Sequence, residues 1–306
     1  MNSFIKKSAI SLGFDACGIA AAEKLIADAE FFKQWLIDGK HAEMRYLERN
    51  FDKRADPRLL VPDCKSVIVV LLNYFNDIKQ PALSPKIARY AHSAVDYHTI
   101  IKEKLNKLEA VIVEKYGENV VNNTIQHSFT DSAPIFERRW AERAGLGWIG
   151  RNTQFVANDL GSFCFIGCLL LNVEMEYDTP VKNRCENCKK CENACPAKAL
   201  ENGVLDSRKC ISYQTIENKQ FISEDFRHFL SGYIVGCDIC ANVCPHNEKW
   251  AKPHNHRELE PVKEIASWTK SDWQNIEEKQ FNDIFEKSAI KRLKFEKLKD
   301  NLKSKE

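Results

Sequence analysis

The sequence lacks the features that mark membrane and secreted proteins. No apolar stretch reaches the roughly 18 residues that a membrane-spanning helix needs, and the segment Met1–Gly13 has neither a long apolar core nor a small-residue cleavage site. The chain also has no internal repeat and no low-complexity segment. We therefore expect a protein that works in the cytoplasm and does not enter a membrane.

Two nucleotide-binding signatures are absent as well. The sequence contains no GxGxxG, which cradles a dinucleotide, and no GxxxxGK followed by Ser or Thr, which cradles nucleotide phosphates. A large excess of positive charge is also missing, because the 306 residues carry a net charge of only +2. This balance argues against wholesale nucleic-acid binding, but it leaves room for a local basic surface.

Cysteine, in contrast, is abundant and unevenly distributed. Of the 12 cysteines, eight crowd between Cys185 and Cys244. In a reducing compartment such crowding indicates metal or redox chemistry rather than disulfide bonds. The other four are scattered through the first half of the chain, where we expect buried, small hydrophobic side chains: Cys17, Cys64, Cys164 and Cys168.

Hydrophobic patterning predicts an α/β domain over residues 1–175. Helical and strand-like segments alternate in this part of the chain, as they do in folds that pack helices on a sheet. We expect a cysteine-rich module over 176–250 and a polar, helical segment over 251–306. The predicted helices are Ala21–Gly39, Thr99–Tyr116 and Glu137–Ala144, and the predicted strands are Ser66–Phe75, Glu118–Ser128 and Phe163–Val173.

The first half of the cysteine-rich segment has the spacing of bacterial ferredoxins, Cys185-x-x-Cys188-x-x-Cys191-x-x-x-Cys195-Pro196. Three thiolates at three-residue intervals let a tight loop ligate three irons of one 4Fe–4S cubane. The fourth cysteine begins a helical segment that points to the other cluster, and the proline limits the backbone just after it.

The second half, Cys237-x-x-Cys240-x-x-x-Cys244-Pro245, is incomplete. A full motif would have another cysteine three residues before Cys237, where this chain has Ile234. Cys210 is the nearby spare cysteine, and we expect it to supply the missing ligand through a longer loop. Crossed ligation then assigns Cys185, Cys188, Cys191 and Cys244 to cluster one, and Cys195, Cys210, Cys237 and Cys240 to cluster two.

A pair of structural zinc sites is the alternative, since zinc also binds four cysteines. Zinc motifs usually pair two separated Cys-x-x-Cys hooks, and they seldom contain a cysteine triplet followed by Cys-Pro, which occurs here twice. The spacing therefore favours two 4Fe–4S clusters and electron transfer. A ferredoxin alone needs about sixty residues, so the α/β part of the chain must use the electrons.

Two stretches of the α/β part contain polar residues suited to chemistry. In Phe129–Gly150, a turn with Asp131 precedes a helix and a glycine-rich segment. Asp131 or the serine after it could simply cap that helix, with Pro134 in its first turn. Alternatively, Asp131 is a general acid whose proton is retained by partial burial. Arg89–His98 clusters aromatic and basic groups before a helix, where a histidine is more often a cap or a buried structural group than a catalyst.

Taken in order, these stretches resemble the epoxyqueuosine reductase family over nearly the whole chain. So many separate matches make the resemblance specific. The matching segments include Arg54–Pro57, Asp96-Tyr97-His98, Asp131–Glu137, both cysteine motifs, Arg208–Glu217 and Ser288–Arg292.

The resemblance implies a cobalamin-binding α/β domain, related to reductive dehalogenases, followed by a ferredoxin-like module. Members of the family bind cobalamin beside two 4Fe–4S clusters. They reduce the epoxide of epoxyqueuosine at the wobble position of a tRNA anticodon, giving queuosine. The same resemblance makes Asp131 the proton donor beside cobalamin, and it implies cobalamin contacts from Arg54, Tyr97 and His98.

The implied partners are tRNA with epoxyqueuosine in its anticodon loop and an external low-potential electron donor. Arg138, Arg139 and Arg151 are candidates for phosphate contacts, as is the segment 287–306 with its eight Lys or Arg residues, although such a tail is also typical of a solvated helix face.

The chain departs from the family pattern in two ways. The segment 91–96 is one residue longer, and the chain stops soon after Arg292, which resembles the short form of the family. Two other functions are compatible with the same cofactor-binding motifs. One is a reductive dehalogenase-like reductase of a small molecule, and the other is a ferredoxin-type electron-transfer protein.

Overall fold

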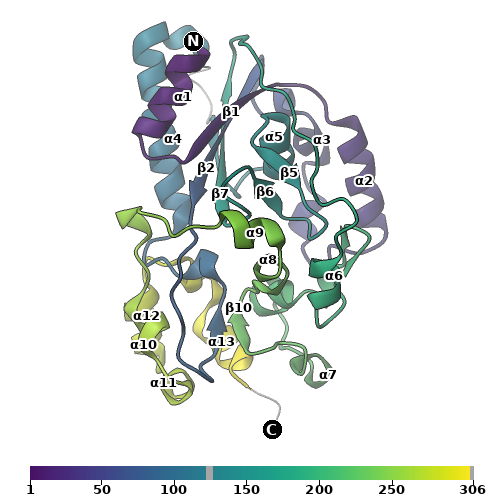
Figure 1. The fold of residues 1–306 in the computed structure, drawn as a ribbon, viewed down its shortest axis with the longest axis vertical. Helices are drawn as coiled ribbons and strands as arrows, with labels where there is room; N and C mark the ends of the chain where they lie inside the picture. The colour runs from purple at the N-terminus through teal and green to yellow at the C-terminus, as the bar shows by residue number, and fades with distance from the viewer. Residues whose placement is uncertain (122–126, 304–306) are drawn as a thin grey trace.

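A four-stranded antiparallel sheet forms the centre of the first half of the molecule (Figure 1). The computed structural model describes residues 1–121 and 127–303. In the sheet, Val69 at the middle of β2 faces Gly18 on one side and Cys168 on the other. The strands, in the order β1-β2-β7-β4, are β1 (Ala16–Ala21), β2 (Ser66–Asn73), β7 (Cys164–Leu171) and β4 (Ser128–Phe129).

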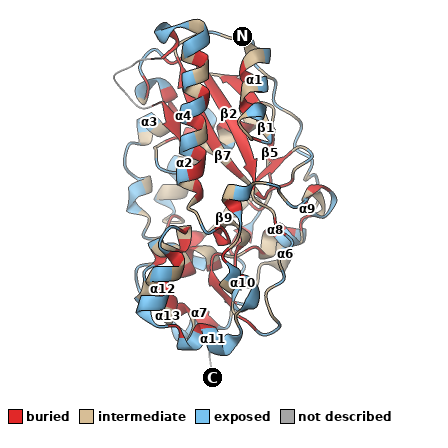
Figure 2. Cartoon of the chain, turned by 90° about the vertical axis from the view of Figure 1, so that its left-hand side faces the viewer, coloured by how far each residue is buried: buried red, intermediate tan, exposed pale blue. Residues whose placement is uncertain are grey.

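The central strand β2 is buried along its whole length because both faces of the sheet are covered. Its even-numbered residues from Ile68 to Leu72 face one hydrophobic core, and its odd-numbered residues from Val67 to Leu71 face another. Figure 2 shows these buried strands in red between the helices. The first core is covered by α1 (Asn2–Ser11) and α4 (Tyr97–Tyr116), and the second by α5 (Glu137–Arg143).

Most of the elements predicted for this half are confirmed. The strands Ser66–Phe75 and Phe163–Val173 correspond to β2 and β7. The helix Thr99–Tyr116 corresponds to α4, which begins earlier because the carboxylate of Asp96 caps it by accepting a hydrogen bond from the backbone N–H of His98. Helices and strands alternate as expected, yet the neighbouring strands of this sheet run antiparallel.

Two predicted elements have different bounds. The helix predicted over Ala21–Gly39 is α2 (Ile26–Ile37), because Ala21 still belongs to β1. The strand predicted over Glu118–Ser128 is wrong at its start, where Glu118–Val120 forms a 3-10 turn. Residues 122–126 of that prediction lie outside the described residues.

The second half of the molecule is built from short elements around the cysteines. β10 (Tyr233–Val235) pairs in parallel with β3 (Lys86–Ile87), which comes from the first half of the chain. Residues 86–91 thus pack with the C-terminal segment, although the sequence division at 175 separates them. Three short elements belong instead with α2 and α5 in the first half (Figure 1): α3 (Phe51–Ala55), β5 (Gly147–Ile149) and β6 (Phe155–Ala157). The remaining elements of the second half are α6 (Lys190–Ala194), β8 (Leu200–Glu201), β9 (Val204–Leu205), α7 (Glu224–Arg227), α8 (Ile239–Asn242), α9 (Pro245–Trp250), α10 (Lys263–Ser267), α11 (Lys270–Asn275), α12 (Glu278–Phe285) and α13 (Phe295–Asn301).

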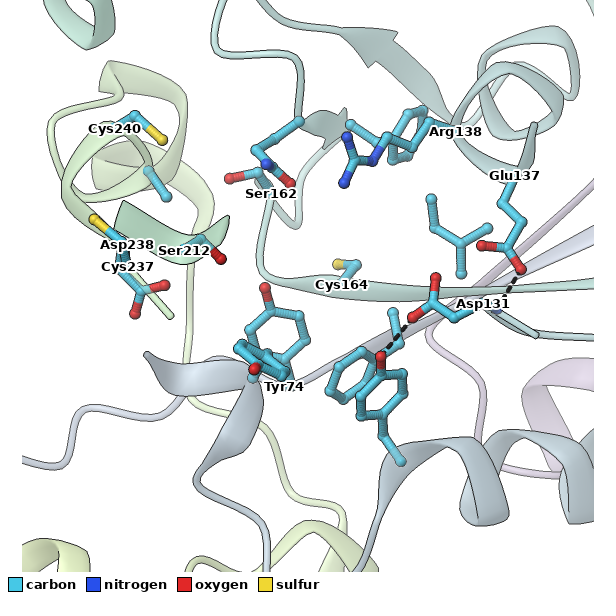
Figure 3. A pocket seen from close by; sticks show the side chains of 17 residues that line it. Tyr74, Asp131, Glu137, Arg138, Ser162, Cys164, Ser212, Cys237, Asp238 and Cys240 are labelled. Carbon is cyan, nitrogen blue, oxygen red and sulfur yellow. Dashed lines mark hydrogen bonds between the residues drawn. The ribbon is translucent and has the colours of Figure 1, made fainter. Parts of the chain in front are cut away.

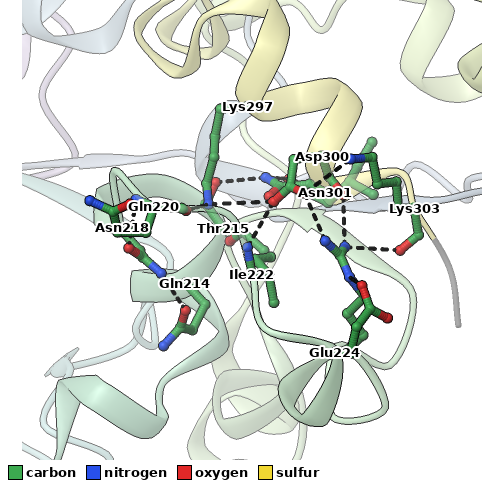
Figure 4. Close-up of polar contacts among 12 residues, drawn as sticks. Gln214, Thr215, Asn218, Gln220, Ile222, Glu224, Lys297, Asp300, Asn301 and Lys303 are labelled. Atoms are coloured by element: carbon green, nitrogen blue, oxygen red, sulfur yellow. Dashed lines mark hydrogen bonds and ion pairs between the residues drawn. The ribbon is translucent and has the colours of Figure 1, made fainter.

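The C-terminal helix α13 is anchored in the cysteine-rich module rather than lying free in solvent (Figure 4). Asp300 forms a buried ion pair with Arg227 at 2.7 Å. The side-chain amide of Asn301 donates hydrogen bonds of 2.8 Å to the carbonyl oxygens of Thr215 and Ile234. The basic tail therefore has a helix, as predicted, but one side of that helix is buried.

Over the described residues, no helix is long and apolar enough to cross a membrane.

Candidate active site and cysteine groups

A pocket lies between the edge of the central sheet and the cysteine-rich module (Figure 3). It encloses about 250 Å³ within a wider hollow of about 990 Å³ that opens to solvent. Asp131, Glu137 and Arg138 line one end, and Cys237 and Cys240 line the other. The predicted proton donor and two predicted cluster ligands therefore face the same space.

Asp131 occupies a strained turn at the start of this pocket. Its backbone has φ of +50°, the left-handed region that an aspartate tolerates better than most residues. The turn is fixed at its base because the hydroxyl of Thr130 donates to the carbonyl of Ile166 across 2.9 Å. The helix-capping alternative is wrong, since α5 begins at Glu137 with Phe136 at its N-cap and without a side-chain cap. Pro134 consequently precedes the helix and does not lie in its first turn.

Tyr97 holds the carboxylate of Asp131 by a short hydrogen bond. The phenolic O–H donates to Asp131 Oδ2 across 2.5 Å. The ring is itself fixed, because it stacks on Phe165 with centroids 4.0 Å apart and planes 4° from parallel. Burial, followed by the charge of Asp131, raises the pKa of Tyr97, so this group stays protonated and remains a donor.

Glu137 is a second carboxyl group beside Asp131. Its Oε1 accepts a hydrogen bond of 2.6 Å from the backbone N–H of Asp131. Burial, followed by the negative charge of Asp131, raises the pKa of Glu137 well above its ordinary value. The side chain of Asp131 is 53% exposed. Burial thus favours a retained proton on Glu137, directly beside Asp131.

His98 lies behind Tyr97 and is held from two sides. Its Nδ1 donates to the carboxylate of Asp96 across 2.6 Å, and its Nε2 accepts from Arg292 Nη1 across 3.1 Å. Nε2 is also 3.8 Å from Asp131 Oδ2. His98 is therefore near the acid, but its hydrogen bonds tie α4 to the C-terminal segment.

Arg54 lies in α3 and is not part of the pocket lining. Its guanidinium packs over the ring of Phe32, 5.8 Å from the centroid. Among the described residues, its buried Nε has no hydrogen-bond partner. Because a buried donor without a partner is costly, this atom indicates an acceptor on a bound molecule.

Four cysteines line a second, smaller pocket. They are the set expected for cluster one: Cys185, Cys188, Cys191 and Cys244. Asn152 lines the same pocket and is only 4% exposed. Its Oδ1 accepts from the backbone N–H of Gln154, while its buried Nδ2 has no partner within the described residues. That free amide indicates an acceptor inside the pocket.

The other four clustered cysteines also approach one another. The thiol of Cys240 interacts electrostatically with the thiols of Cys237 and Cys210. The thiol of Cys237 interacts in the same way with those of Cys210 and Cys195. Ile234 belongs to β10, and its side chain is buried in the core shared with the C-terminal helices. The position at which the motif lacks a cysteine therefore belongs to a β-strand, and its side chain contributes to a hydrophobic core.

The two cysteine groups adjoin each other, since the thiol of Cys240 also interacts electrostatically with that of Cys191 and α6 packs on α8. In the described part of the chain, no three Cys, His, Asp or Glu side chains converge closely enough to hold a single metal ion.

The four remaining cysteines differ in exposure. Cys64 and Cys168 are buried, as predicted, whereas Cys17 and Cys164 are partly exposed, and Cys164 lines the main pocket. Burial raises the pKa of Cys17 and of Cys64 to about 12, so both thiols stay protonated.

Of the three arginines suggested for phosphate contacts, only Arg138 lines the pocket and is exposed. Arg139 pairs with Asp28 at 2.6 Å, and Arg151 pairs with Glu192 at 3.0 Å. Sequence reasoning missed the roles of Glu137 and Asn152. Glu137 stood inside a matching motif, but no sequence pattern indicates that its carboxyl folds back onto Asp131.

Two sequence families match separate parts of the chain. Residues 184–247, which contain all eight clustered cysteines, match the family described as a 4Fe-4S double cluster binding domain. Residues 54–132, which contain Arg54, Tyr97, His98 and Asp131, match the family described as epoxyqueuosine reductase QueG.

Curated relatives match nearly the whole chain. The epoxyqueuosine reductase of Cellulophaga algicola is 42% identical, and the match covers 98% of this chain and 96% of the relative. That of Leadbetterella byssophila is also 42% identical, with 97% and 96% covered.

Solved structures agree with these matches. An epoxyqueuosine reductase crystallised with an epoxyqueuosine-modified tRNA-Tyr stem loop has a TM-score of 0.87 at 28% identity, covering 98% of this chain and 79% of that one. The Bacillus subtilis enzyme, described with its catalytic aspartate loop swung out of the active site, has a TM-score of 0.86 at 27% identity, with the same coverage. A catabolic reductive dehalogenase shares the fold, with a TM-score of 0.50 at 15% identity over 95% of this chain and 37% of that one.

Proposed function

This chain belongs to the epoxyqueuosine reductase family, and we propose that it reduces the epoxide of epoxyqueuosine at the wobble position of tRNA, giving queuosine, with Asp131 as the proton donor. The reaction consumes two electrons and two protons, and the epoxide oxygen leaves as water. The delivery of electrons and the delivery of protons can both be assigned to residues of the main pocket.

One observation carries the proposal. The same pocket has Asp131 at one end and the cysteines of the second group, Cys237 and Cys240, at the other. A substrate between them would meet a source of protons on one side and a source of electrons on the other. An electron-transfer protein without a reaction of its own would not need this arrangement.

We assign the eight clustered cysteines as ligands of two 4Fe–4S clusters with crossed ligation. Cluster one takes the four cysteines of the smaller pocket, and the unpartnered amide of Asn152 fits a cluster sulfide as its acceptor. Cluster two takes Cys195, Cys210, Cys237 and Cys240. When present, the clusters supply electrons one at a time.

The wide part of the main pocket fits a large planar cofactor such as cobalamin. Its aromatic lining is suited to a ring system. Arg54 lies outside the lining, and its unpartnered Nε is suited to a polar side group at the edge of such a cofactor. Arg54, Tyr97, His98 and Asp131 are the residues that we assign to its neighbourhood. When bound there, cobalamin supplies a cobalt centre that accepts electrons singly and reacts with carbon electrophiles.

The chain's own contribution is the proton. An opening epoxide develops charge on its oxygen, and an alkoxide leaves poorly unless it is protonated. The exposed carboxyl of Asp131 can reach that oxygen, while Tyr97 fixes its direction through Oδ2. Glu137 retains a proton next to Asp131 because its pKa is raised, so it can restore the acid after the transfer.

The substrate tRNA has to present its modified base to this pocket, which requires the base to leave its stack. Arg138 is the exposed cation at the pocket and is suited to a nearby phosphate. The left-handed turn at Asp131 is consistent with a loop that changes position when the base enters. We propose a cytoplasmic enzyme, since tRNA is found there, supplied by an external low-potential electron donor.

A single-turnover assay tests the function. The protein is reconstituted anaerobically with iron, sulfide and cobalamin, reduced with dithionite, and mixed with an epoxyqueuosine-containing stem loop. Mass spectrometry of the nucleosides should show loss of one oxygen and formation of queuosine. Absence of product from a protein that holds both clusters and cobalamin would contradict the proposal.

A further inference from the structure

Exposed cations gather on the loop that carries the first three cysteines of cluster one. Between residues 182 and 190, the chain has four exposed cations and one exposed carboxylate, Glu186. The whole chain, in comparison, has a net charge of only +2. We call these four residues the cluster-one basic surface: Lys182, Arg184, Lys189 and Lys190.

The charges of this surface are available to a partner. Among the described residues, the ion pairs do not include any of its four cations, whereas the neighbouring Glu192 is neutralised by Arg151 at 3.0 Å. Between residues 182 and 190, Glu186 is thus the carboxylate set against four cations, and an excess of positive charge remains.

The loop that presents these cations is held in place. Asn183 donates to the carbonyl of Ile149 across 2.9 Å and accepts from the backbone N–H of Cys185 across 2.9 Å. The guanidinium of Arg184 packs over two tryptophan rings, 5.6 Å from the centroid of Trp148 and 5.7 Å from that of Trp250. A rigid surface loses little entropy when a partner docks on it.

The two clusters differ in what surrounds them. Cysteines of cluster two line the main pocket, which the substrate must occupy, whereas the cluster-one pocket is lined by Lys190 and His246. A protein donor docked at cluster two would compete with the substrate. An electron that enters at cluster one can pass to cluster two, because α6, which carries Cys191, packs on α8, which carries Cys240.

We propose that the cluster-one basic surface is the docking site of a small acidic electron-transfer protein, an inference that depends on the clusters of the proposed function. In the step itself, the carrier is oxidised by one electron and one cluster is reduced by one electron, with no proton or atom exchanged. Complementary charge raises the rate of encounter more than it raises affinity, which suits a carrier that must leave after each electron.

Nucleic acid is the competing partner for a basic surface. The tRNA base has to reach the main pocket, and Arg138 is the exposed cation there. The four cations of the surface instead surround cysteines that do not line that pocket. This position favours a carrier over tRNA.

The test measures reduction of the clusters by a reduced flavodoxin, used as the acidic carrier. Protein reconstituted with iron and sulfide, without cobalamin or tRNA, is mixed in a stopped-flow instrument, and the loss of cluster absorbance is followed. The variant is Lys189→Glu with Lys190→Glu. The matched control is Lys102→Glu with Lys107→Glu, two exposed lysines of α4, which lies on the opposite side in Figure 1.

The second-order rate constant should fall by about tenfold or more in the Lys189 and Lys190 variant at low salt, and it should stay near wild type in the control. Wild-type rates should fall as salt is added, and dithionite should reduce all three proteins equally. Lys189→Ala with Lys190→Ala should give an intermediate loss.

Equal flavodoxin rates for the variant and the control would overturn the proposal. So would weaker binding of a tRNA stem loop with unchanged flavodoxin rates, because the surface would then belong to tRNA. A protein that forms no clusters at all would instead contradict the proposed function, so the two failures are distinguishable. If the charge-reversed pair loses iron, the alanine pair and Lys182→Glu provide the same comparison.

Discussion

The backbone N–H of Asp131 donates a hydrogen bond to Glu137 Oε1 across 2.6 Å, so two carboxyl groups meet at one end of the main pocket. The first is half exposed and faces the substrate space, and the second has a raised pKa. This division suggests different tasks for the two groups. We propose that Asp131 transfers a proton and that Glu137 keeps one in reserve.

Replacing Asp131 should abolish most turnover without loss of cofactors. We expect Asp131→Asn to lower the single-turnover rate by between about a hundredfold and ten-thousandfold, because an amide cannot deliver a proton to the opening epoxide. Iron content and the corrinoid spectrum should match wild type. Asp63→Asn is the control, since Asp63 is also exposed and has φ of +61°. Full activity of Asp131→Asn would remove this residue from the chemistry.

Glu137 should make stability depend on pH. Its pKa is raised in the folded chain, so the folded state binds a proton that the unfolded state releases near the ordinary glutamate pKa of about 4.3. The stabilisation is complete below that value and is lost as pH rises through the raised pKa.

Glu137→Gln cannot ionise and should escape this loss. Relative to wild type, the melting temperature of the variant should therefore rise between about pH 5 and about pH 8. Thermal denaturation followed by circular dichroism at several pH values measures the difference. A difference that stays constant with pH would mean that Glu137 is ionised in the folded protein throughout.

The sequence predicted the long elements and the cysteine chemistry for physical reasons. β2 contains a continuous apolar run, and α4 has apolar residues at helical spacing. In both elements the tertiary contacts favour the same secondary structure as the local sequence. The thiol spacing is a local property of a tight loop, so it can be recognised without a fold.

Contacts between distant segments could not be predicted in the same way. The meeting of Tyr97 with Asp131 depends on how α4 packs against β7, and the pairing of β3 with β10 joins residues far apart in the chain. The capping hypothesis for Asp131 failed because the chain makes a tight turn at Ala133–Ile135 before α5 begins, and no residue preference in the sequence predicts that turn.

Cys210 should be a ligand of cluster two. Cys210→Ser should lower iron and sulfide from about eight to about four atoms of each per chain, because one cluster loses a thiolate while the other is intact. The control is Cys164→Ser, a partly exposed cysteine of β7 outside both groups, which should keep the wild-type iron content. Eight irons in the Cys210 variant would mean that another side chain completes the second cluster.

Asn152 should tune the potential of cluster one. Its buried, unpartnered Nδ2 faces the pocket of the four cysteines, and a hydrogen bond to a cluster sulfur stabilises the reduced form. Asn152→Ala should therefore lower the midpoint potential of one cluster, on the order of tens of millivolts. Redox titration followed by electron paramagnetic resonance measures this shift. Asn187→Ala, an exposed residue of the same loop, should leave both potentials unchanged, and equal potentials in the two variants would rule out the hydrogen bond.

The ion pair between Arg227 and Asp300 should determine whether the C-terminal helix stays docked. Both side chains are almost fully buried, with exposed fractions of 3% and 1%. Asp300→Ala would leave the guanidinium in a buried site with fewer acceptors, which costs about 3 kcal/mol in the free energy of unfolding. Urea denaturation of the cluster-loaded protein measures the loss, and Asp225→Ala, an exposed aspartate of α7, is the control.

The consequence of that substitution should extend to cluster two. The next residue of α13, Asn301, holds the carbonyls of Thr215 and Ile234, and the hydroxyl of Thr215 accepts from the N–H of Gly236, directly before Cys237. If α13 loosens, the loops that carry Cys210 and Cys237 lose this brace, and cluster two should be released by a chelator faster than cluster one. Equal release of the two clusters in Asp300→Ala would show that α13 stabilises the fold without bracing the cluster.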